Sequence, residues 1–137
     1  MIAYLDTSII LLPLLGQGKG LDWRKWDAVY SSELFGLEAR RTIDRLRLEM
    51  ALDDMGVAAA HQELSRIERH IGIVPLNRAV LRRSALPMPT VVKTLDAIHL
   101  TSALLLGEYK GTNLTFATHD LQQATAAKAF GFEVLGV

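Results

Sequence analysis

Two short stretches of the sequence, far apart in the chain, end in the same types of side chain. MIAYLDTS at the start and LTFATHD near the end each consist of an apolar run that leads to hydroxyl side chains and a carboxylate. Asp6 is followed by Thr7 and Ser8, and Asp120 follows Thr118 by two positions. Because ligands of open parallel sheets bind beyond the carboxyl ends of the strands, we expect Asp6 and Asp120 to meet at one edge of a sheet.

Two other acidic residues stand beside apolar helical stretches. Glu38, in SELFGLEARR, borders the apolar positions Leu34 and Leu37, and Asp96 heads the strongly apolar stretch TLDAIHLTSALLLG. A helix that is hydrophobic nearly all round is a buried one. A carboxylate that enters such a helix needs a cap, an ion partner or a metal ion.

Each acid also has a purely structural interpretation. Asp120, with Gln123 three positions later, is close to a capping box for the last helix, and Asp6 or Ser8 could cap the first helix.

For the other two acids the structural interpretations are different. Asp96 competes with Thr94 as the cap of its helix. Glu38 could form an ion pair with Arg41 or Arg45 on a helix surface.

A convergence of all four acids would need either protonation or a cation at neutral pH. Two carboxylates about 4 Å apart repel by roughly 4 kcal/mol at an intermediate effective dielectric constant. The chain has no cysteine, and His61 and His70 have no partner ligands nearby in the sequence, so we expect no zinc site. Ligation by oxygen alone favours Mg²⁺ or Mn²⁺, ions that activate water for attack on a phosphodiester.

The elements that must position these residues alternate between strand and helix. We expect strands at residues 1–5, 28–31, 71–76, 114–118 and 132–137. Helices are expected at 8–15, at about 33–52, over the apolar positions 57–71, after Asn77, at 95–106 with Gly107 as the stop, and at 121–130. Parallel strands need crossover connections. The alternation therefore predicts one α/β domain over residues 1–137, with three layers and a mainly parallel central sheet flanked by helices.

Composition and charge limit the class of protein. The chain has 137 residues, of which half are hydrophobic and 22% charged, which is a globular composition. The absence of cysteine and of a charged leader favours a cytoplasmic protein, and the run IILLPLL is too short to span a membrane. A formal net charge of zero argues against a protein that holds long nucleic acids by bulk electrostatics. Residues 40–83 nevertheless carry nine arginines, most of which we expect on solvated helix faces.

The glycine-rich stretch GQGKG, residues 16–20, is not a phosphate-binding loop. The pattern G-x-x-x-x-G-K-[ST] would need glycine where Pro13 stands and Ser or Thr where Gly20 stands. We expect an ordinary loop there.

The order LDTS, SELFGLE, LDAIHL and ATHD resembles the PIN-domain nucleases, and the chain length is similar to that of VapC-type toxins of toxin–antitoxin pairs. The resemblance covers essentially the whole chain, and no single motif in it is specific. It implies a PIN-like fold and a Mg²⁺- or Mn²⁺-dependent endoribonuclease that acts on structured RNA such as tRNA or rRNA. It further implies a homodimer and a cognate antitoxin protein.

The resemblance also assigns residues. It makes Asp6, Glu38, Asp96 and Asp120 the catalytic, metal-binding acids, with Thr7, Ser8 and Thr118 orienting ligands or water.

Basic side chains next to these acids are candidates for contact with the substrate. Arg40 or Arg41 is a candidate phosphate contact, with pairing to Glu33 or Asp44 as the alternative, and His119 is a candidate for substrate contact.

One histidine and two tryptophans are expected to be buried in the core. His99 has apolar neighbours, so we expect it to be satisfied in the interior rather than to bind RNA. Trp23 and Trp26 are expected to pack in the core, with a partner contact as the alternative.

Other functions fit less well. A haloacid-dehalogenase-like phosphatase would need an aspartate where Ser8 stands, and a receiver domain would need one near Val74-Pro75-Leu76. The remaining alternative is a catalytically silent PIN-like domain that binds protein or RNA. The presence of all four acids argues against it.

Overall fold

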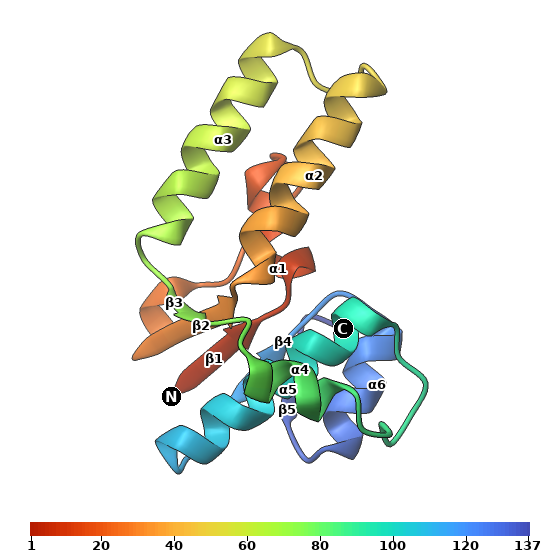
Figure 1. Cartoon of the computed structure of the whole chain (residues 1–137). Coiled ribbons are helices and arrows are strands. Elements are labelled where there is room, and N and C mark those ends of the chain that lie inside the picture. The colour runs from red at the N-terminus through yellow and green to blue at the C-terminus, as the bar shows by residue number, and fades with distance from the viewer.

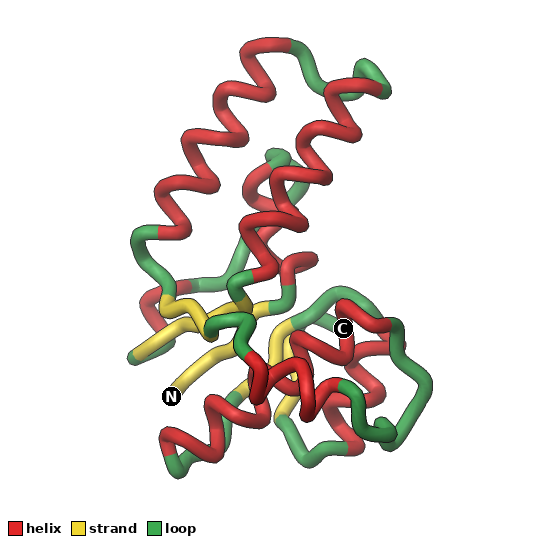
Figure 2. Tube along the Cα trace, viewed as in Figure 1, coloured by secondary structure: helices red, strands yellow, loops and turns green.

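The computed structural model describes residues 1–137 and has a five-stranded sheet at its centre (Figures 1 and 2). The strands are β1 (Ile2–Leu5), β2 (Ala28–Ser32), β3 (Gly72–Val74), β4 (Thr115–Ala117) and β5 (Glu133–Leu135). Their order is β3-β2-β1-β4-β5, and all four neighbouring pairs are parallel. This confirms the expected α/β fold with a parallel central sheet.

Helices connect the strands. They are α1 (Thr7–Leu14), the 3₁₀ helix η1 (Trp23–Lys25), α2 (Leu34–Leu48), α3 (Asp54–Glu68), α4 (Arg78–Ser84), α5 (Thr94–Lys110) and α6 (Leu121–Ala129).

The alternation of side chains along β1 separates the core into two halves. Ala3 and Leu5 face one side, where they pack with buried residues of α1, α2 and α3. Tyr4 faces the other side, where it packs with buried residues of α4, α5 and α6. The sheet is therefore the middle layer of three, because successive side chains of a strand point to opposite faces.

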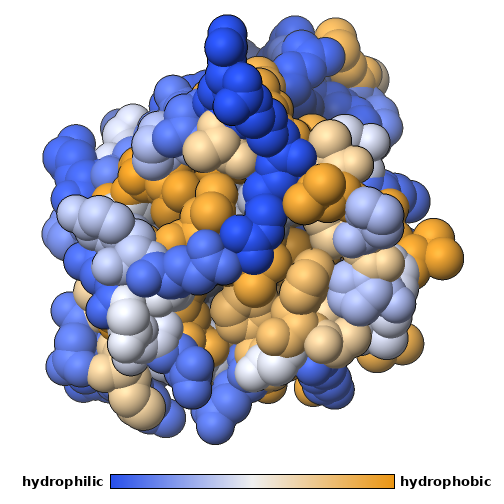
Figure 3. All heavy atoms as spheres, turned by 60° about the horizontal axis from the view of Figure 1, so that its bottom comes forward, coloured by the Kyte–Doolittle hydropathy of each residue, from blue (hydrophilic) through white to orange (hydrophobic).

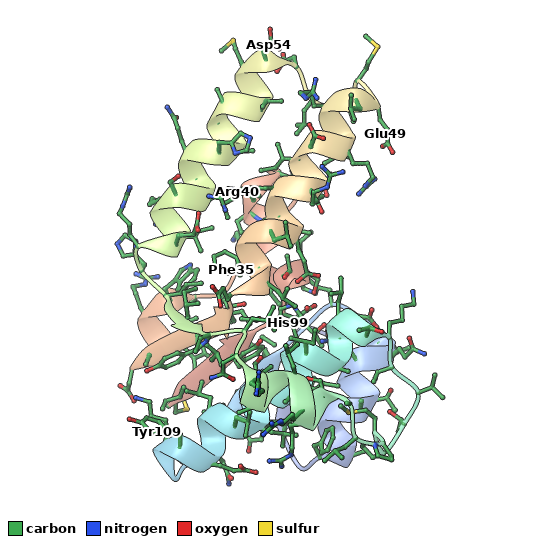
Figure 4. All side chains as sticks on the ribbon, viewed as in Figure 1. Phe35, Arg40, Glu49, Asp54, His99 and Tyr109 are labelled. Carbon is green, nitrogen blue, oxygen red and sulfur yellow. The ribbon has the colours of Figure 1, made fainter.

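Helices α2 and α3 form a hairpin that projects beyond the sheet (Figure 1). Leu64 and Ile67 of α3 belong to the same buried cluster as Ile43 of α2, which holds the two helices together. Between them, Arg40 forms an ion pair with Glu68 at 2.6 Å (Figure 4).

Several helix ends differ from the sequence prediction, and α3 spans Asp54–Glu68 rather than the expected 57–71, but the carboxyl ends of α5 and α2 differ most. The helix expected to stop at Gly107 continues to Lys110 and ends at Gly111, whose φ of 64° is the left-handed conformation that glycine adopts most readily. The helix expected over 33–52 ends at Leu48, and the turn beyond it places Met50 at a φ of 58°. In both cases the local backbone conformation, which hydrophobic periodicity does not encode, determines the end of the helix.

The strand order creates a switch point beside β1. From β1 the chain runs outward through β2 to β3 on one side, whereas β4 and β5 lie on the other side. The carboxyl ends of β1 and β4 are therefore neighbours at the point where the direction of winding reverses. In open α/β sheets this is where ligands bind.

Apolar side chains are exposed on part of the surface. Figure 3, which brings the bottom of Figure 1 forward, shows apolar surface on both sides of a hydrophilic ridge. An apolar hollow of about 520 Å³ lies between β3, α4 and the end of α5, and Ile73 and Tyr109 are among its lining residues. None of the helices is long and apolar enough to cross a membrane.

The end of β5 approaches β4 so closely that Gly136 has no room for a side chain. Gly136 has a φ of 102°, and a Cβ atom there would lie 2.5 Å from the carbonyl oxygen of Thr118. Replacing Gly136 with Ala should therefore lower the free energy of unfolding by more than the about 1–2 kcal/mol of a left-handed alanine. Gly131→Ala is the matched control, since Gly131 has a φ of 92° and nothing within 4 Å of its Cβ position. Equal urea midpoints for the two variants would contradict this account.

Candidate active site

The acidic residues come from elements that meet at the carboxyl edge of the sheet. Asp6 directly follows β1, and its backbone N–H donates to the carbonyl oxygen of Ala117 in β4 at 2.9 Å. Asp120 follows β4 and begins α6, Asp96 lies in the first turn of α5, and Glu38 lies near the start of α2.

The four carboxylates influence one another electrostatically. The pKa of Asp96 is raised from 3.8 to about 6, first by burial and then by the negative charges of Asp6, Asp120 and Glu38, with His99 opposing the shift. A like charge nearby disfavours the ionised form of a carboxylate. The raised pKa of Asp96 therefore reflects its burial first, together with the negative charge gathered at this edge.

Hydroxyl groups hold Asp6. The Oγ of Ser8 donates to Asp6 Oδ2 at 2.7 Å, and the Oγ1 of Thr118 lies 3.0 Å from the same oxygen. Thr118 Oγ1 also accepts from the backbone N–H of Asp120 at 3.0 Å. One threonine hydroxyl thus joins the carboxylate after β1 to the start of α6.

A buried network holds Glu38. Thr7 Oγ1 donates to Glu38 Oε1 at 2.8 Å, and His99 Nε2 lies 2.6 Å from the same oxygen. On its other side, His99 Nδ1 lies 2.9 Å from the hydroxyl of Tyr4. His99 Nε2 thus faces Glu38, whereas Nδ1 faces the hydroxyl of Tyr4, so both ring nitrogens have a hydrogen-bond partner. His99 occupies the centre of the molecule, below the start of α2 (Figure 4).

The network also determines protonation. Burial alone would raise the pKa of Glu38, but the hydrogen bond and charge of His99, with the hydrogen bond from Thr7, bring that pKa below its usual value. Burial raises the pKa of Tyr4 well above its ordinary value, so the phenol stays protonated. Glu38 is therefore ionised at neutral pH although it is partly buried.

Three of the structural interpretations can now be judged. Asp120 does cap α6, because its Oδ1 accepts from the backbone N–H of Gln123 at 3.0 Å. The capping box is wrong, since the side chain of Gln123 lies against Thr118 and the backbone oxygen of Asp96 instead. Asp96 is not a cap, because α5 begins after Lys93 without a side-chain cap.

The ion-pair interpretation of Glu38 is also wrong. Arg41 pairs with Asp44 at 3.5 Å, and Arg45 pairs with Glu49 at 3.5 Å. Both arginines lie on the solvated side of α2, whereas Glu38 faces Thr7 and His99. This leaves Glu38 without any arginine partner.

The substrate-contact candidates lie in different places. Arg40 reaches toward α3, where Glu68 neutralises it, and Arg41 has the alternative partner Asp44. His119 is exposed beside the acids, and its Nδ1 lies 2.8 Å from the carbonyl oxygen of Gly136. Of these three residues, only His119 stands at the acidic edge without an ion pair.

Each of the four acids keeps an oxygen that no hydrogen bond of the protein uses. These are Asp6 Oδ1, Glu38 Oε2, Asp120 Oδ2 and both carboxylate oxygens of Asp96. No three of the histidine, aspartate and glutamate side chains are arranged to hold one metal ion together. Carboxylate oxygens are the right chemistry for a hard cation such as Mg²⁺, which takes one or two carboxylates and keeps several waters.

Sequence reasoning missed Tyr4 as part of the site. Tyr4 and Asp6 share one face of the first strand at a spacing of two, and Asp96 and His99 share one face of α5 at a spacing of three. The sequence signal that could have identified Tyr4 is its position two residues before the candidate acid Asp6, which places both on the same face of the strand.

The two tryptophans follow the core expectation. Trp23 and Trp26 are partly buried and pack against the hydrophobic cluster that contains α1, α2 and α3. Trp26 also lines a surface hollow beside His119.

The sheet order and the acidic edge define a PIN-like α/β fold, and comparisons with known proteins agree with this. No protein-family model matches the chain. Ribonuclease VapC47 of Mycobacterium tuberculosis (strain CDC 1551 / Oshkosh) is 25% identical over 130 residues, which cover 94% of this chain and 92% of the relative.

Solved structures show the same fold. The structure of FitAB bound to an IR36 DNA fragment has a TM-score of 0.71 at 20% identity and covers 98% of this chain and 94% of its own. VapBC-5 from Mycobacterium tuberculosis is a member of the VapBC family of toxin–antitoxin systems. Its structure has a TM-score of 0.66 at 18% identity, and the match covers 99% of this chain and 98% of the other. VapBC2 from Rickettsia felis, bound to a DNA fragment from its promoter, has a TM-score of 0.65 at 10% identity and covers 98% of both chains. The PIN-like fold and the resemblance to VapC-type proteins are thereby confirmed.

The buried network predicts that His99 stabilises the fold. His99→Leu would remove the partner of the Tyr4 hydroxyl and leave Glu38 Oε1 with Thr7 alone, at a cost of about 1–3 kcal/mol for a buried unsatisfied group. We expect urea unfolding to show this loss. The exposed His61 provides the control, and His61→Leu should leave the midpoint unchanged. A His99→Leu protein as stable as wild type would show that the network contributes nothing.

The raised pKa of Asp96 predicts a pH dependence of stability. Because the folded state holds this proton more tightly than the unfolded state, the stabilising contribution is complete below about pH 4 and is lost as the pH rises through about 6. Asp96→Asn should therefore gain stability relative to wild type over this window, by about 1 kcal/mol after allowance for solvent screening of a half-buried group. Urea midpoints between pH 4 and pH 8 test this. The exposed Asp54 at the tip of the hairpin (Figure 4) is the control, and a gain equally large in Asp54→Asn would contradict the assignment.

Proposed function

We propose that this protein is a metal-dependent endoribonuclease and the toxin component of a type II toxin–antitoxin pair, hydrolysing RNA phosphodiester bonds at its four carboxylates. The observation that carries the proposal is the concentration of four acids from four elements at the switch point of the sheet, with no arginine or lysine ion pair among them. The similarity to ribonuclease VapC47 along nearly the whole chain supports the same activity.

The donor set suits Mg²⁺ or Mn²⁺. Among Asp6, Glu38, Asp96 and Asp120, one or two would bind the cation directly through an unused oxygen, and the others would contact it through its water molecules, because no three of them surround one point. When bound, the cation would lower the pKa of a water molecule and neutralise charge on the phosphodiester. It would also relieve the mutual repulsion that raises the pKa of Asp96.

The chain's own hydroxyls and His99 preorganise the acids. Ser8 and Thr118 fix one oxygen of Asp6, and Thr7 and His99 fix one oxygen of Glu38. In each case the second oxygen is left available. Partners of this kind around metal ligands orient them and typically contribute about 10–100-fold to metal affinity or activity.

Partners follow from the same relatives. VapBC-5 is by name a member of a family of toxin–antitoxin systems, which supports a cognate antitoxin as a partner. The proposal also includes a homodimer and a cytoplasmic location. Exposed apolar residues such as Ile73 and Tyr109 offer surface for such contacts. Structured RNA, such as tRNA or rRNA, is the proposed substrate.

A catalytically silent binding domain is the second candidate. The observation that favours it is that no three of the acidic and histidine side chains surround one point. A domain of this kind would bind its protein or RNA partner without cutting.

Cleavage of a small-RNA pool separates the two candidates. Wild-type protein should cut RNA at discrete sites with Mg²⁺ or Mn²⁺ and not with chelator. Asp6→Asn should lose more than about 100-fold in rate, since even residues that only support a ligand contribute about 10–100-fold. Asp54→Asn, which removes the same charge at the far tip of the hairpin, should cut like wild type.

Thermal unfolding provides a second measurement. The metal should raise the midpoint of wild type and of Asp54→Asn but not that of Asp6→Asn, because a ligand stabilises the state that binds it. A folded wild-type protein that neither cuts RNA nor responds to metal would favour the silent domain.

A further inference from the structure

A hollow with both charged and apolar lining residues lies beside the acids and is not part of the proposed metal site. Its volume is about 280 Å³, and it is formed by the loop after α1, the 3₁₀ helix η1, His119 and the end of β5. Lys19, Lys25 and Trp26 are among its lining residues. The volume is at the lower end of the range for ligand sites, which suits one nucleotide rather than a longer segment.

A continuous chain of hydrogen bonds joins the hollow to the acids. Ser8 Oγ donates to Asp6 Oδ2 at 2.7 Å and accepts from the backbone N–H of His119 at 3.0 Å. His119 Nδ1 in turn lies 2.8 Å from the carbonyl oxygen of Gly136, which lines the hollow. Ser8 and His119 therefore link Asp6 to the rim of the hollow.

The lining of the hollow contains two lysines and one aspartate, so its net charge is positive. Neither Lys19 nor Lys25 takes part in an ion pair, whereas Asp22, the acid of the lining, pairs with Arg24 at 3.3 Å. By contrast, Arg40 and Arg41 on α2 are paired with acids of the hairpin.

The wall of the hollow is fixed in place. Gly20 lies so close to α1 that a Cβ atom would be 2.9 Å from Pro13 Cγ, which ties the glycine-rich loop to the helix. Trp26 packs against the core and also borders the hollow, so its ring forms a rigid aromatic wall. Rigid aromatic rings beside cations are how proteins bind single-stranded nucleic acid.

We propose that this hollow binds one nucleotide of an RNA strand, with Lys19 and Lys25 contacting its phosphate and Trp26 contacting its base. The inference rests on the proposed function, because it places a neighbouring nucleotide next to the bond that the acids would cut. It gives the glycine-rich loop and Trp26 a role in substrate binding.

Binding in the presence of chelator tests the hollow without cleavage. The probe is a fluorescein-labelled pool of mixed-sequence RNA hexamers, measured by anisotropy. Lys19→Ala/Lys25→Ala should bind at least about 10-fold more weakly than wild type, with a salt slope shallower by about 0.7 for each phosphate that the variant no longer neutralises. The matched control is Lys110→Ala/Lys128→Ala, which removes two exposed lysines at the ends of α5 and α6 and should bind like wild type.

Fluorescence tests the aromatic wall. The chain has two tryptophans, so Trp23→Phe leaves Trp26 as the sole one. The same RNA pool, without its label, should quench this emission, and the quenching should weaken when Lys19→Ala/Lys25→Ala is added. Unchanged emission on saturation would overturn the contact between Trp26 and a base.

The possible outcomes distinguish failure of the proposed RNA-binding hollow from failure of the proposed nuclease activity. If wild type cuts RNA and Lys19→Ala/Lys25→Ala binds and cuts equally well, the hollow is excluded and the proposed function stands. If the lysine variant loses binding but no metal supports cutting by wild type, the hollow stands and the nuclease is excluded. Absence of any hexamer binding by wild type overturns the hollow, as does a lysine variant that loses only binding to a protein partner.

Discussion

The parallel pairing of β1 with β4 is the constraint on which the candidate site depends. The ladder places Leu5 beside Ala117 and continues into the bond from Asp6 N–H to the carbonyl oxygen of Ala117. Because the register of a sheet is specified by its buried faces, Asp6 cannot move relative to Thr118 without a change in the core. The same pairing creates the switch point. The pairing of β1 with β4 therefore determines both the topology of the sheet and the position of the acids.

Concentrating negative charge at this edge costs free energy, and the surrounding residues reduce that cost without removing it. Hydroxyl donors stabilise Asp6, and Thr7 and His99 stabilise Glu38, so these two carboxylates are held in place. No hydrogen bond holds the side chain of Asp96, and its pKa is raised to about 6. Asp96 is thus the carboxylate whose ionised form a bound cation would stabilise most.

The sequence predicts the parts of the site that follow from strand ends. Asp6 and Asp120 each come directly after an apolar strand, and parallel pairing brings the ends together regardless of the helices. The contact between Glu38 and His99 was beyond sequence reasoning, because it joins α2 to α5 across 61 positions and depends on how both helices cross the sheet. The end of α5 at Gly111 rather than Gly107 depends on one backbone torsion, to which side-chain periodicity is insensitive.

Overall neutrality conceals a division of charge that bears on RNA binding. Six of the nine arginines between residues 40 and 83 are paired with acids on helix surfaces, namely Arg40, Arg41, Arg45, Arg47, Arg66 and Arg83. Such exposed pairs contribute little stability, but they leave few arginines free for phosphate. The unpaired lysines beside the acids lie instead on the loop after α1 and on η1. On the proposed function, an RNA strand at the acids would meet Lys19 and Lys25 nearby, which would favour contact with a few phosphates over binding along a long track.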